Sequence, residues 1–498
     1  MNPLSHALEA YRRALPPGEL ATFSLAPFDR LGVPNQSAAF FSPGGAMNGG
    51  TGYGTTEEAA LVSALGELAE ELGAARAVPQ MPVTEASLLE LQRRGAPFCD
   101  PRRLGIDAGA PFSPEMTRRW VEVKRWPSGE AVLVPIEYVA TYAGDCGADY
   151  APLVVPITNG LGAGLSRDAA IAHGLLELLQ RDGNGLQIRS LATGLALDQS
   201  TIFDPIARDL LSRFDAAGVD VEIKVASTQD GFVNLYVAGI DRDEGPNSPL
   251  MSAAGGEASH PVAVVALRKA LLEWAASRSR LAFMHGPLSE VEKFAPPGYL
   301  VTMRARFSPR AHEKRALDAM TAWSAQSLQS ARNRLMQRVL RVEERVSFDE
   351  LPSAPENLSD DKTALCREVA ACLESSGFEV LVADFSPPNG DGEVFAVKVI
   401  AVGLEVETLS YGRVGARGAA RLLERDDVQL LRRGEPFEGG RRVWLLPDVE
   451  ASLGGPLWLD WPAVEALVGP LYALHREPGR HAGAFAGELA ASQSAGKL

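Results

Sequence analysis

The sequence has few cysteines, and their spacing does not indicate a site. Cys99, Cys146, Cys366 and Cys372 are scattered through 498 residues and include no CxxC pair. The missing CxxC pair and the scatter of four cysteines through a long chain argue against both a zinc module and a disulfide framework. The seven histidines include no HExxH or HxxxH pair, so a metal site built from histidines has little support.

Long hydrophobic runs are also missing. No uninterrupted apolar stretch is long enough to span a membrane, and the first twenty residues, MNPLSHALEAYRRALPPGEL, lack the apolar core of a secretory signal. Basic residues are outnumbered, 48 against 63 acidic ones, which gives a formal net charge of −15. Such a balance gives no general attraction for nucleic acid or anionic membranes. We therefore expect a cytoplasmic protein with reduced thiols, and neither nucleic acid nor membrane as a partner.

What is present is the composition of a large folded protein, with 46% hydrophobic and 22% charged residues. Segments rich in β-branched residues predict strands, and they alternate with segments whose apolar residues follow a helical period. Strands are expected at 131–139, 221–227, 234–240, 378–385 and 395–402, and helices at 204–218 and 364–377. The fold class is therefore α/β, a mixed α+β chain with several sheets packed against helices. The basic segment 304–345 is expected to be helical, either as a connecting pair or as a docking face for a peptide or partner.

A glycine-rich stretch followed by an amphipathic helix occurs two or three times. A shift of 110 residues places TTEEAALVSALGELAEE over LSRDAAIAHGLLELLQR, and AVVALRKALLEWAASR follows 96 residues later. The first helix carries a polar row opposite its leucines, and this row has counterparts in the later repeats. The residues in these rows are Ser63, Glu67, Glu70, His173, Glu177, Gln180 and Glu273.

The repeated pattern has a chemical use. Glycines let backbone N–H groups approach an anion, and the N-terminus of a helix favours phosphate. Glutamates from several helices that face one cleft could hold Mg²⁺, which binds few carboxylates directly and completes its shell with water and phosphate oxygens. A Walker A sequence does not occur, so the phosphate site is not of the P-loop kind. The alternative is a duplicated helix that keeps only its packing pattern, with exposed carboxylates.

These residues resemble the YcaO family, whose nucleotide motifs are SxxxExxER, ExxxR and ExxQ, with a GKG ahead of the first and NGxAAG ahead of the second. The matching segments here are SALGELAEE, ELLQR, EWAASR and TNGLGAG. They supply Ser63, Glu67, Glu70, Glu177, Arg181, Glu273, Arg278, Asn159 and Gly160. The likeness runs along most of the chain, from FDRLGVP near the start to VFAVKVIAVGLE.

The resemblance implies a YcaO-like fold around a nucleotide cleft and an enzyme that uses ATP and Mg²⁺ to phosphorylate a backbone amide oxygen of a peptide or protein. It implies Glu67, Glu70, Glu177 and Glu273 as metal ligands. It assigns the catalytic positions to Glu67, Glu177, Arg181 and Arg278, with both arginines facing phosphate. It assigns nucleotide contacts to Ser63, Asn159, Gly160, Gln180 and Tyr53.

Three positions depart from the family pattern. Tyr53 stands where GKG has lysine, Glu71 replaces the arginine of SxxxExxER, and Ala276 replaces the glutamine of ExxQ. The missing lysine charge could come from Lys269 or Arg278. These departures leave open a second interpretation, in which the protein is a degenerate scaffold that binds peptide without turning over ATP.

The end of the chain differs as well. Azoline-forming members end in a PxPxP that reaches the active site, whereas this chain passes through PLYALHREPGRHAGAF. Its ending is similar to that of members paired with a TfuA-type protein, which implies thioamide formation with such a partner; azoline formation is the alternative. REPGRH could also be a surface turn made by Pro478 and Gly479. Family members often form homodimers. We expect an N-terminal segment at 1–44, an ATP-binding core at 45–350, an α/β lobe at 351–440 and a tail at 441–498.

Overall fold

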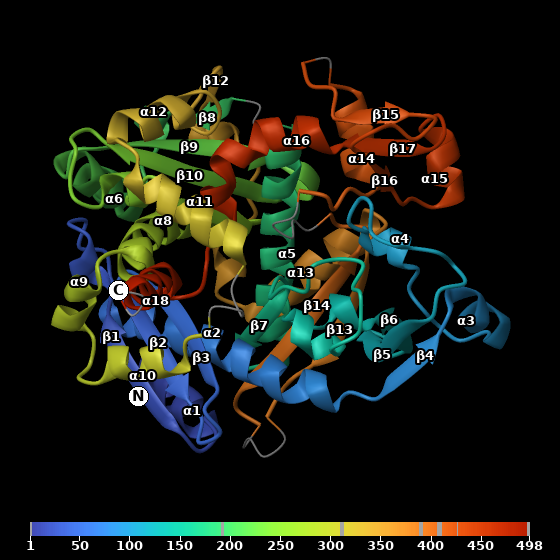
Figure 1. The fold of residues 1–498 in the computed structure, drawn as a ribbon, viewed down its shortest axis with the longest axis horizontal. Coiled ribbons are helices and arrows are strands. Elements are labelled where there is room, and N and C mark those ends of the chain that lie inside the picture. Colours follow the sequence, from blue (N-terminus) through green and yellow to red (C-terminus); the bar gives the residue numbers. More distant parts are fainter. Residues whose placement is uncertain are drawn as a thin grey trace.

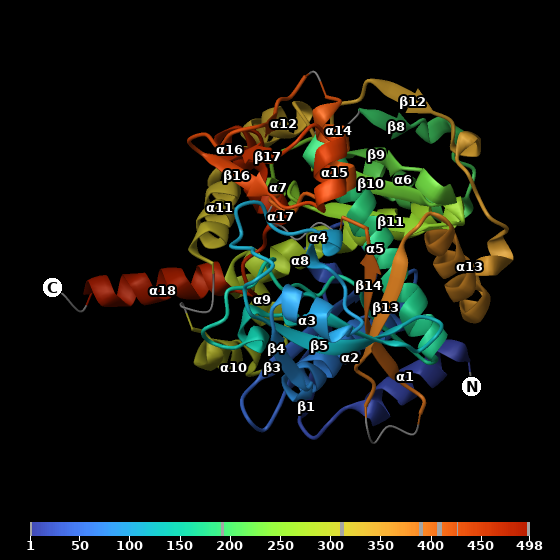
Figure 2. The same cartoon turned by 90° about the vertical axis from the view of Figure 1, so that its right-hand side faces the viewer.

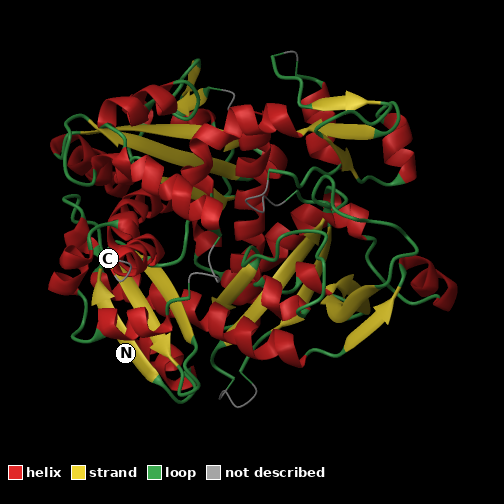
Figure 3. Ribbon diagram, in the orientation of Figure 1, coloured by secondary structure: helices red, strands yellow, loops and turns green. Residues whose placement is uncertain are grey.

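The computed structural model describes residues 2–190, 194–308, 313–387, 392–405, 411–425 and 427–495. These residues form four separate sheets with helices packed between and around them (Figures 1 and 3). The expected mixed class with several sheets is therefore confirmed. Among the described residues, the structure has no helix that is both long enough and apolar enough to cross a membrane.

The first sheet is antiparallel and contains β1 (Glu19–Ser24), β2 (Asn35–Phe41) and β3 (Met47–Tyr53) in this order. The second has the order β11 (Gly255–His260), β10 (Val233–Asp241), β9 (Val219–Ser227), β8 (Leu195–Leu197) and β12 (Glu344–Val346). The third has the order β4 (Val83–Ala86), β5 (Arg118–Arg125), β13 (Glu379–Asp384), β14 (Phe395–Val402) and β7 (Leu161–Gly164), and β6 (Ala131–Pro135) pairs with β5. The fourth has the order β15 (Leu431–Arg433), β17 (Leu457–Asp460) and β16 (Gly440–Val443).

The three glycine–helix repeats are three strand–helix units. The strand β3 leads into α2 (Glu57–Ala77), β7 into α5 (Arg167–Ser190), and β11 into α8 (Ala263–His285). Each of these strands is the last strand of a different sheet. The first two helices begin with a side-chain cap, because the hydroxyls of Thr56 and Ser166 accept the backbone N–H groups of residues 59 and 169. The repeats therefore join three sheets at one place, with α5 running through the middle of the molecule (Figure 1).

The remaining helices surround this centre. They are α1 (Pro3–Ala14), α3 (Leu88–Arg94), α4 (Pro101–Leu104), α6 (Pro205–Ala216), α7 (Ser248–Met251), α9 (Leu288–Phe294), α10 (Tyr299–Arg306), α11 (Lys314–Ala325), α12 (Leu328–Met336), α13 (Lys362–Ser375), α14 (Ala416–Leu423), α15 (Pro447–Ser452), α16 (Trp461–Val468), α17 (Tyr472–His475) and α18 (Ala482–Ala495). The last of them projects from the body of the molecule (Figure 2).

The basic segment 304–345 is divided among several short elements instead of forming one helical stretch. It contains the end of α10, then α11, α12 and β12. Several of its arginines pair with acids of the same chain: Arg304 Nε lies 3.0 Å from Glu488, and Arg315 Nη2 lies 2.6 Å from Glu465. This pairing favours the interpretation as connecting helices over that as a free docking face.

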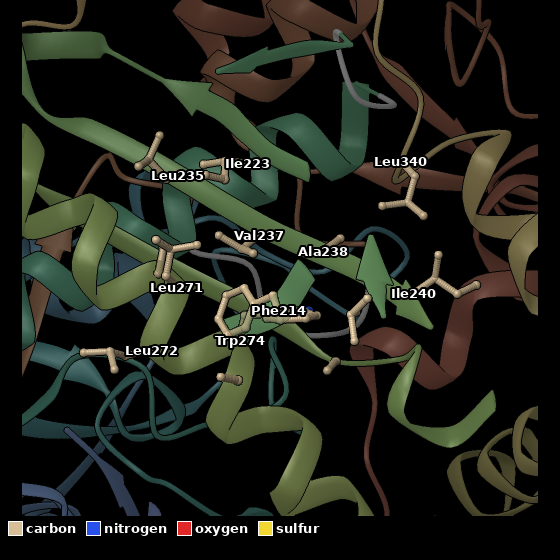
Figure 4. Packing of buried hydrophobic residues seen from close by; sticks show 14 of the residues in the cluster. Phe214, Ile223, Leu235, Val237, Ala238, Ile240, Leu271, Leu272, Trp274 and Leu340 are labelled. Atoms are coloured by element: carbon tan, nitrogen blue, oxygen red, sulfur yellow. The ribbon is translucent and has the colours of Figure 1, made fainter. Parts of the chain in front are cut away.

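A large apolar core fixes the third repeat against the second sheet. Phe214 of α6 and Trp274 of α8 meet edge to face with their ring centroids 4.9 Å apart, and both are almost fully buried (Figure 4). Ile223, Leu235 and Val237 of the sheet complete the packing around them. Because aromatic pairs contribute beyond their buried area, this core holds α8 rigidly beside β11.

The C-terminal sheet lies on both sides of one expected boundary. Our division between residues 440 and 441 falls inside β16, which pairs with β17 at residues 440–443. The lobe around this sheet has its own apolar cluster, which includes Val443, Leu457 and Leu459. Residues 441–498 are therefore not a separate tail, while the other expected boundaries stay predictions.

Glycines allow each strand to lie directly on the helix of its own repeat. A Cβ atom would lie 2.0 Å from a backbone atom of α2 at Gly52, 2.1 Å from one of α5 at Gly162, and 2.2 Å from one of α8 at Gly256. Real Cβ atoms do not approach backbone this closely, so any side chain at these positions would push the helix away from the strand.

This contact predicts the effect of two alanine substitutions. We expect Gly162→Ala to lower the free energy of unfolding by about 3 kcal/mol, because the methyl group collides with backbone that cannot yield. Gly66→Ala is the matched control: this glycine is inside α2 and its Cβ would meet nothing closer than 3.5 Å. It should stabilise the protein by about 0.5–1 kcal/mol. Urea unfolding of both variants checks this, and equal effects would contradict it.

Candidate functional site

A cavity of about 620 Å³ opens where the three repeats meet. One face of each repeat helix and the adjoining ends of β3, β7 and β11 line it. The lining residues on the helices include Ser63, Glu67, Glu70 and Glu71 of α2, His173, Glu177, Gln180 and Arg181 of α5, and Lys269, Glu273, Ala276, Ser277 and Arg280 of α8. The volume is in the range of small-molecule and cofactor sites.

The lining residues follow the same spacing on all three helices. The first residue of each row is followed by a glutamate four residues later and by further residues seven and eight positions on. Steps of four and seven residues return to nearly the same side of an α-helix. Glu67, Glu177 and Glu273 therefore occupy equivalent places on three walls of one cavity.

Backbone amides of the strands hold the carboxylates in place. The N–H of Thr51 in β3 donates to Glu67 at 2.9 Å, and the N–H of Ala163 in β7 donates to Glu70 at 2.9 Å. The second contact joins the strand of one repeat to the helix of another. These bonds fix the orientation of the carboxylates, since a hydrogen bond to an ionised oxygen is stronger than a neutral one.

The carboxylates have unusual proton affinities. Burial, followed by the nearby Glu71, raises the pKa of Glu67 to about 7, and burial with the nearby Glu257 raises the pKa of Glu273 to about 7. Burial and the repulsion of Glu177 and Glu67 raise the pKa of Glu70 well above its ordinary value. Burial in this cavity, with a further contribution from neighbouring acids, therefore makes the ionised form of each acid costly.

Three cationic side chains stand among the acids. Arg181 lies 2.8 Å from Glu257 of β11 and 3.8 Å from Glu177. Arg280 is held by Glu477 at 2.6 Å. Burial lowers the pKa of Lys269, although the carboxylate of Glu273 acts in the opposite direction. All three cations line the cavity, where phosphate oxygens could meet them.

This donor set fits a nucleotide with its Mg²⁺. Within the described ranges, no three histidine, cysteine or acidic side chains stand close enough to hold a metal ion by themselves. Mg²⁺ does not need such a cage, because it binds one or two carboxylates and takes its other ligands from phosphate and water. Acids whose pKa values are raised mainly by burial and further by neighbouring acids, next to cations suited to phosphate, match this need.

The structure brings together most of the residues expected from the sequence. Those in the cavity wall are Tyr53, Ser63, Glu67, Glu70, Glu177, Gln180, Arg181 and Glu273. The hydroxyl of Tyr53 donates to Glu273 at 3.2 Å. The backbone N–H of Gly160 donates to Glu177 at 2.8 Å, so this glycine acts from behind the wall. Asn159 lies in a smaller cavity beside Lys398.

Arg278 corrects one expectation. It is fully buried away from the cavity, where its Nε lies 2.8 Å from Asp29 and its Nη2 lies 3.0 Å from Asp241. The reason is the helical period: position 278 is five residues after Glu273 and points to another side of α8. Arg278 joins α8 to neighbouring elements instead of facing phosphate.

Arg280 takes the place that we assigned to Arg278. It is seven residues after Glu273, so the same helical period could have identified it from the sequence. Glu257, which accepts a hydrogen bond from Arg181, was also missed, and it precedes the third helix at the strand position equivalent to Thr51. A strict alignment of the third repeat at the strand would have found it, whereas the partnership of Arg280 with Glu477 has no local sequence signal.

The REPGRH segment lies against the site and is not a surface turn. Pro478 and His481 are buried, and Glu477 accepts two hydrogen bonds from Arg280, both at 2.6 Å. Burial raises the pKa of Glu477, but the guanidinium of Arg280 outweighs it and holds this pKa below its usual range. The surface-turn interpretation is therefore wrong.

Comparison with known proteins identifies the domain. Residues 51–405 match the protein-family model of the YcaO cyclodehydratase, which is described as binding ATP and Mg²⁺. The expected family and its two cofactors are thereby confirmed. An uncharacterized protein of Methanothermobacter thermautotrophicus is 27% identical over 398 residues, which is 78% of this chain and 90% of the relative.

Two solved structures share the fold. A heterocyclase in complex with substrate and cofactor superposes with a TM-score of 0.61 and 16% identity, covering 84% of this chain but 54% of the heterocyclase, so this chain spans about half of that protein. YcaO from Methanopyrus kandleri, bound with AMPPCP and Mg²⁺, gives a TM-score of 0.56 and 19% identity, covering 83% of this chain and 94% of the other.

From the buried acids we predict that the protein has a lower free energy of unfolding when the site holds no ligand. The pKa of Glu70 is raised on folding, so its folded state takes up protons, and stability is lost as the pH rises through the folded pKa. Without nucleotide and Mg²⁺, Glu70→Gln should therefore increase the free energy of unfolding at pH 8 by on the order of 1 kcal/mol and change it little at pH 4. Urea unfolding at both pH values measures this. A variant that is less stable than wild type at pH 8 would contradict it.

Proposed function

We propose that this protein, which belongs to the YcaO family, uses ATP and Mg²⁺ to activate a backbone amide of a peptide or protein substrate. One observation carries the proposal. Three equivalent glutamates, Glu67, Glu177 and Glu273, stand on three helices around one cavity and alternate with cations suited to phosphate. The arrangement fits a charged nucleotide far better than an apolar ligand.

The side chains can be given distinct roles. Glu67 and Glu70 of α2, together with Glu177 and Glu273, would provide oxygen ligands for more than one Mg²⁺, each ion binding one or two of these carboxylates. Arg181 would face the phosphates, as would Arg280 and Lys269. Ser63 and Gln180 would supply hydrogen bonds to the nucleotide from the same cavity wall.

Tyr53 would have a different role from the lysine of the family pattern. Burial and the adjacent Glu273 raise its pKa well above the ordinary value, so its hydroxyl keeps its proton and orients that carboxylate. It adds no positive charge. Asn159 and Gly160 would support the site from behind, through the backbone contact of Gly160 with Glu177.

When bound, ATP with Mg²⁺ would supply the phosphoryl group that turns the substrate's amide oxygen into a leaving group. The protein's task is then to hold that amide beside the phosphates and to exclude water from the reacting atoms. A nucleophile adds to the amide carbon and the oxygen departs with the phosphate. We propose a sulfur nucleophile, giving a thioamide, together with a TfuA-like partner protein. Azoline formation by a side chain of the substrate is the alternative.

A degenerate peptide-binding scaffold is the rival interpretation. Two observations favour it: Tyr53 is engaged with Glu273, and Ala276 leaves the wall of α8 without an amide side chain. Such a scaffold could retain a partner while lacking turnover. A homodimer, which we expect from the resemblance, is compatible with both interpretations.

Calorimetric titration of ATP tests the proposal. Wild type should bind ATP in the presence of Mg²⁺ and much more weakly in EDTA, because the carboxylates repel bare phosphates. Glu177→Ala should reduce the affinity at least about 10-fold, a loss of about 1.4 kcal/mol. Glu368→Ala, an exposed position on α13, is the control and should bind as wild type does. Equal binding by both variants would overturn the placement of the nucleotide.

The product distinguishes the possible reactions. With a TfuA-like partner, a sulfide source, ATP and a substrate peptide, mass spectrometry should show the exchange of one oxygen for sulfur. Loss of one water would instead indicate azoline formation. ATP binding without any turnover in the presence of the partner would favour the scaffold.

A further inference from the structure

The chain segment 472–482 crosses the outer side of the cavity wall and is fastened at both ends. At its start, the hydroxyl of Tyr472 donates to Glu313 at 2.6 Å, and Arg476 Nε donates to the same carboxylate at 2.7 Å. At its end, the N–H of His481 donates to the carbonyl of Met284 at 2.8 Å. The segment is therefore a fixed strap between the beginning of α11 and the end of α8.

Glu477, in the middle of this strap, holds the cation of the third repeat. Its two oxygens accept from Nη1 and Nη2 of Arg280, each at 2.6 Å, in a two-pronged pair. His285, whose side chain is almost fully buried, lies 3.4 Å from the same carboxylate. About a quarter of each side chain of the pair is exposed, so the pair is shielded but borders the cavity. A two-pronged pair fixes the plane of a guanidinium as well as its position.

Arg480, a second charged residue of the strap, also reaches the repeats. Arg480 Nη1 donates to the hydroxyl of Ser37 in β2 at 3.0 Å, and its guanidinium lies 6.0 Å from the ring centroid of Phe283. Its charge lowers the pKa of both Glu67 and Glu71, although burial raises both values more strongly. The strap thus brings two charged residues to the repeats from a part of the chain outside the matched region 51–405.

We propose that the strap completes the nucleotide site: Glu477 is a positioning residue that fixes Arg280 in the cavity wall, where Arg280 contacts the phosphates. This inference rests on the proposed function, since it takes a nucleotide as the ligand. Without Glu477, the long side chain of Arg280 would lose its fixed plane and would face several carboxylates of the cavity. Arg280 would then pair with an acid needed for Mg²⁺ instead of with phosphate.

The test compares two glutamates of the same chain end. Glu477→Gln keeps the shape of the side chain and removes its charge. Glu488→Gln makes the same change at a residue that pairs with Arg304 at 3.0 and 3.1 Å, outside the cavity. Calorimetry with ATP and Mg²⁺ should give about 10-fold weaker binding for Glu477→Gln and wild-type binding for Glu488→Gln. Glu477→Asp, which keeps the charge, should recover part of the loss.

A double variant tests whether Glu477 acts through Arg280. Arg280→Ala should weaken binding at least as much as Glu477→Gln, and the combination should be no weaker than Arg280→Ala alone. If the two losses instead multiply, or if Glu477→Gln binds like wild type, the proposal is overturned.

A readout without nucleotide separates this inference from the proposed function. Trypsin should cleave after Arg476 and Arg480 faster in Glu477→Gln than in wild type, because the strap loses its central contact. Glu488→Gln should not increase cleavage at these two positions. Wild type that does not bind ATP would defeat the proposed function. Unchanged cleavage in Glu477→Gln would defeat the strap even if ATP binds.

Discussion

The direct contact of a glycine strand with the following helix, made three times, is the constraint on which the rest of the structure depends. At Gly52, Gly162 and Gly256 a Cβ atom would come within 2.3 Å of helix backbone, so only glycine permits this distance. On the first two helices a glutamate accepts a backbone N–H from its own repeat: Thr51 donates to Glu67, and Gly160 donates to Glu177. Each strand also lies at the edge of its own sheet and contributes residues to the cavity wall. One backbone contact therefore sets both the spacing of the carboxylates and the place where three sheets meet.

The same geometry creates an electrostatic conflict. Because three helices place acids in one shielded cavity, the pKa of each acid is raised. The pKa values of Glu67 and Glu273 reach about 7. Such a site lowers the stability of the empty protein, and cores such as that of Phe214 and Trp274 hold the helices together against this repulsion. Cations in the cavity wall reduce the repulsion among these acids. Each also has an acidic partner other than Glu67, Glu177 and Glu273: Arg181 pairs with Glu257, and Arg280 pairs with Glu477. The site is thus rigid before any ligand enters, which lowers the cost of ordering on binding.

Local pattern explains what could be predicted from the sequence. The repeat offset of 110 residues placed Glu67 and Glu177 at equivalent sites because helix period and strand length are local properties, and the structure has both in the cavity. The phosphate-facing role assigned to Arg278 was wrong. The family motif was matched to the nearest arginine in the sequence, but a side chain five residues after Glu273 points to another side of the helix. The boundary at 440 failed because pairing of β16 with β17 is a contact between distant residues, which no local pattern reports. The role of Glu477 was beyond reach for the same reason, since 197 residues separate it from Arg280.

The charge pattern of the cavity gives it a direction. The charged lining residues of the first helix are all acids, Glu67, Glu70 and Glu71, whereas the third helix contributes Lys269 and Arg280 beside a single glutamate. A charged ligand in this cavity would therefore meet acids along α2 and most of the basic side chains along α8. Glu71 stands where the family motif has arginine, and this departure sharpens the polarity. Arg480 returns one positive charge to that side, because its guanidinium acts on both Glu67 and Glu71. The segment that contains Glu477 and Arg480 thus offsets the charge of the acidic wall through Arg480 and fixes a cation of the basic wall through Glu477, so the departure at Glu71 and this segment belong to one electrostatic arrangement.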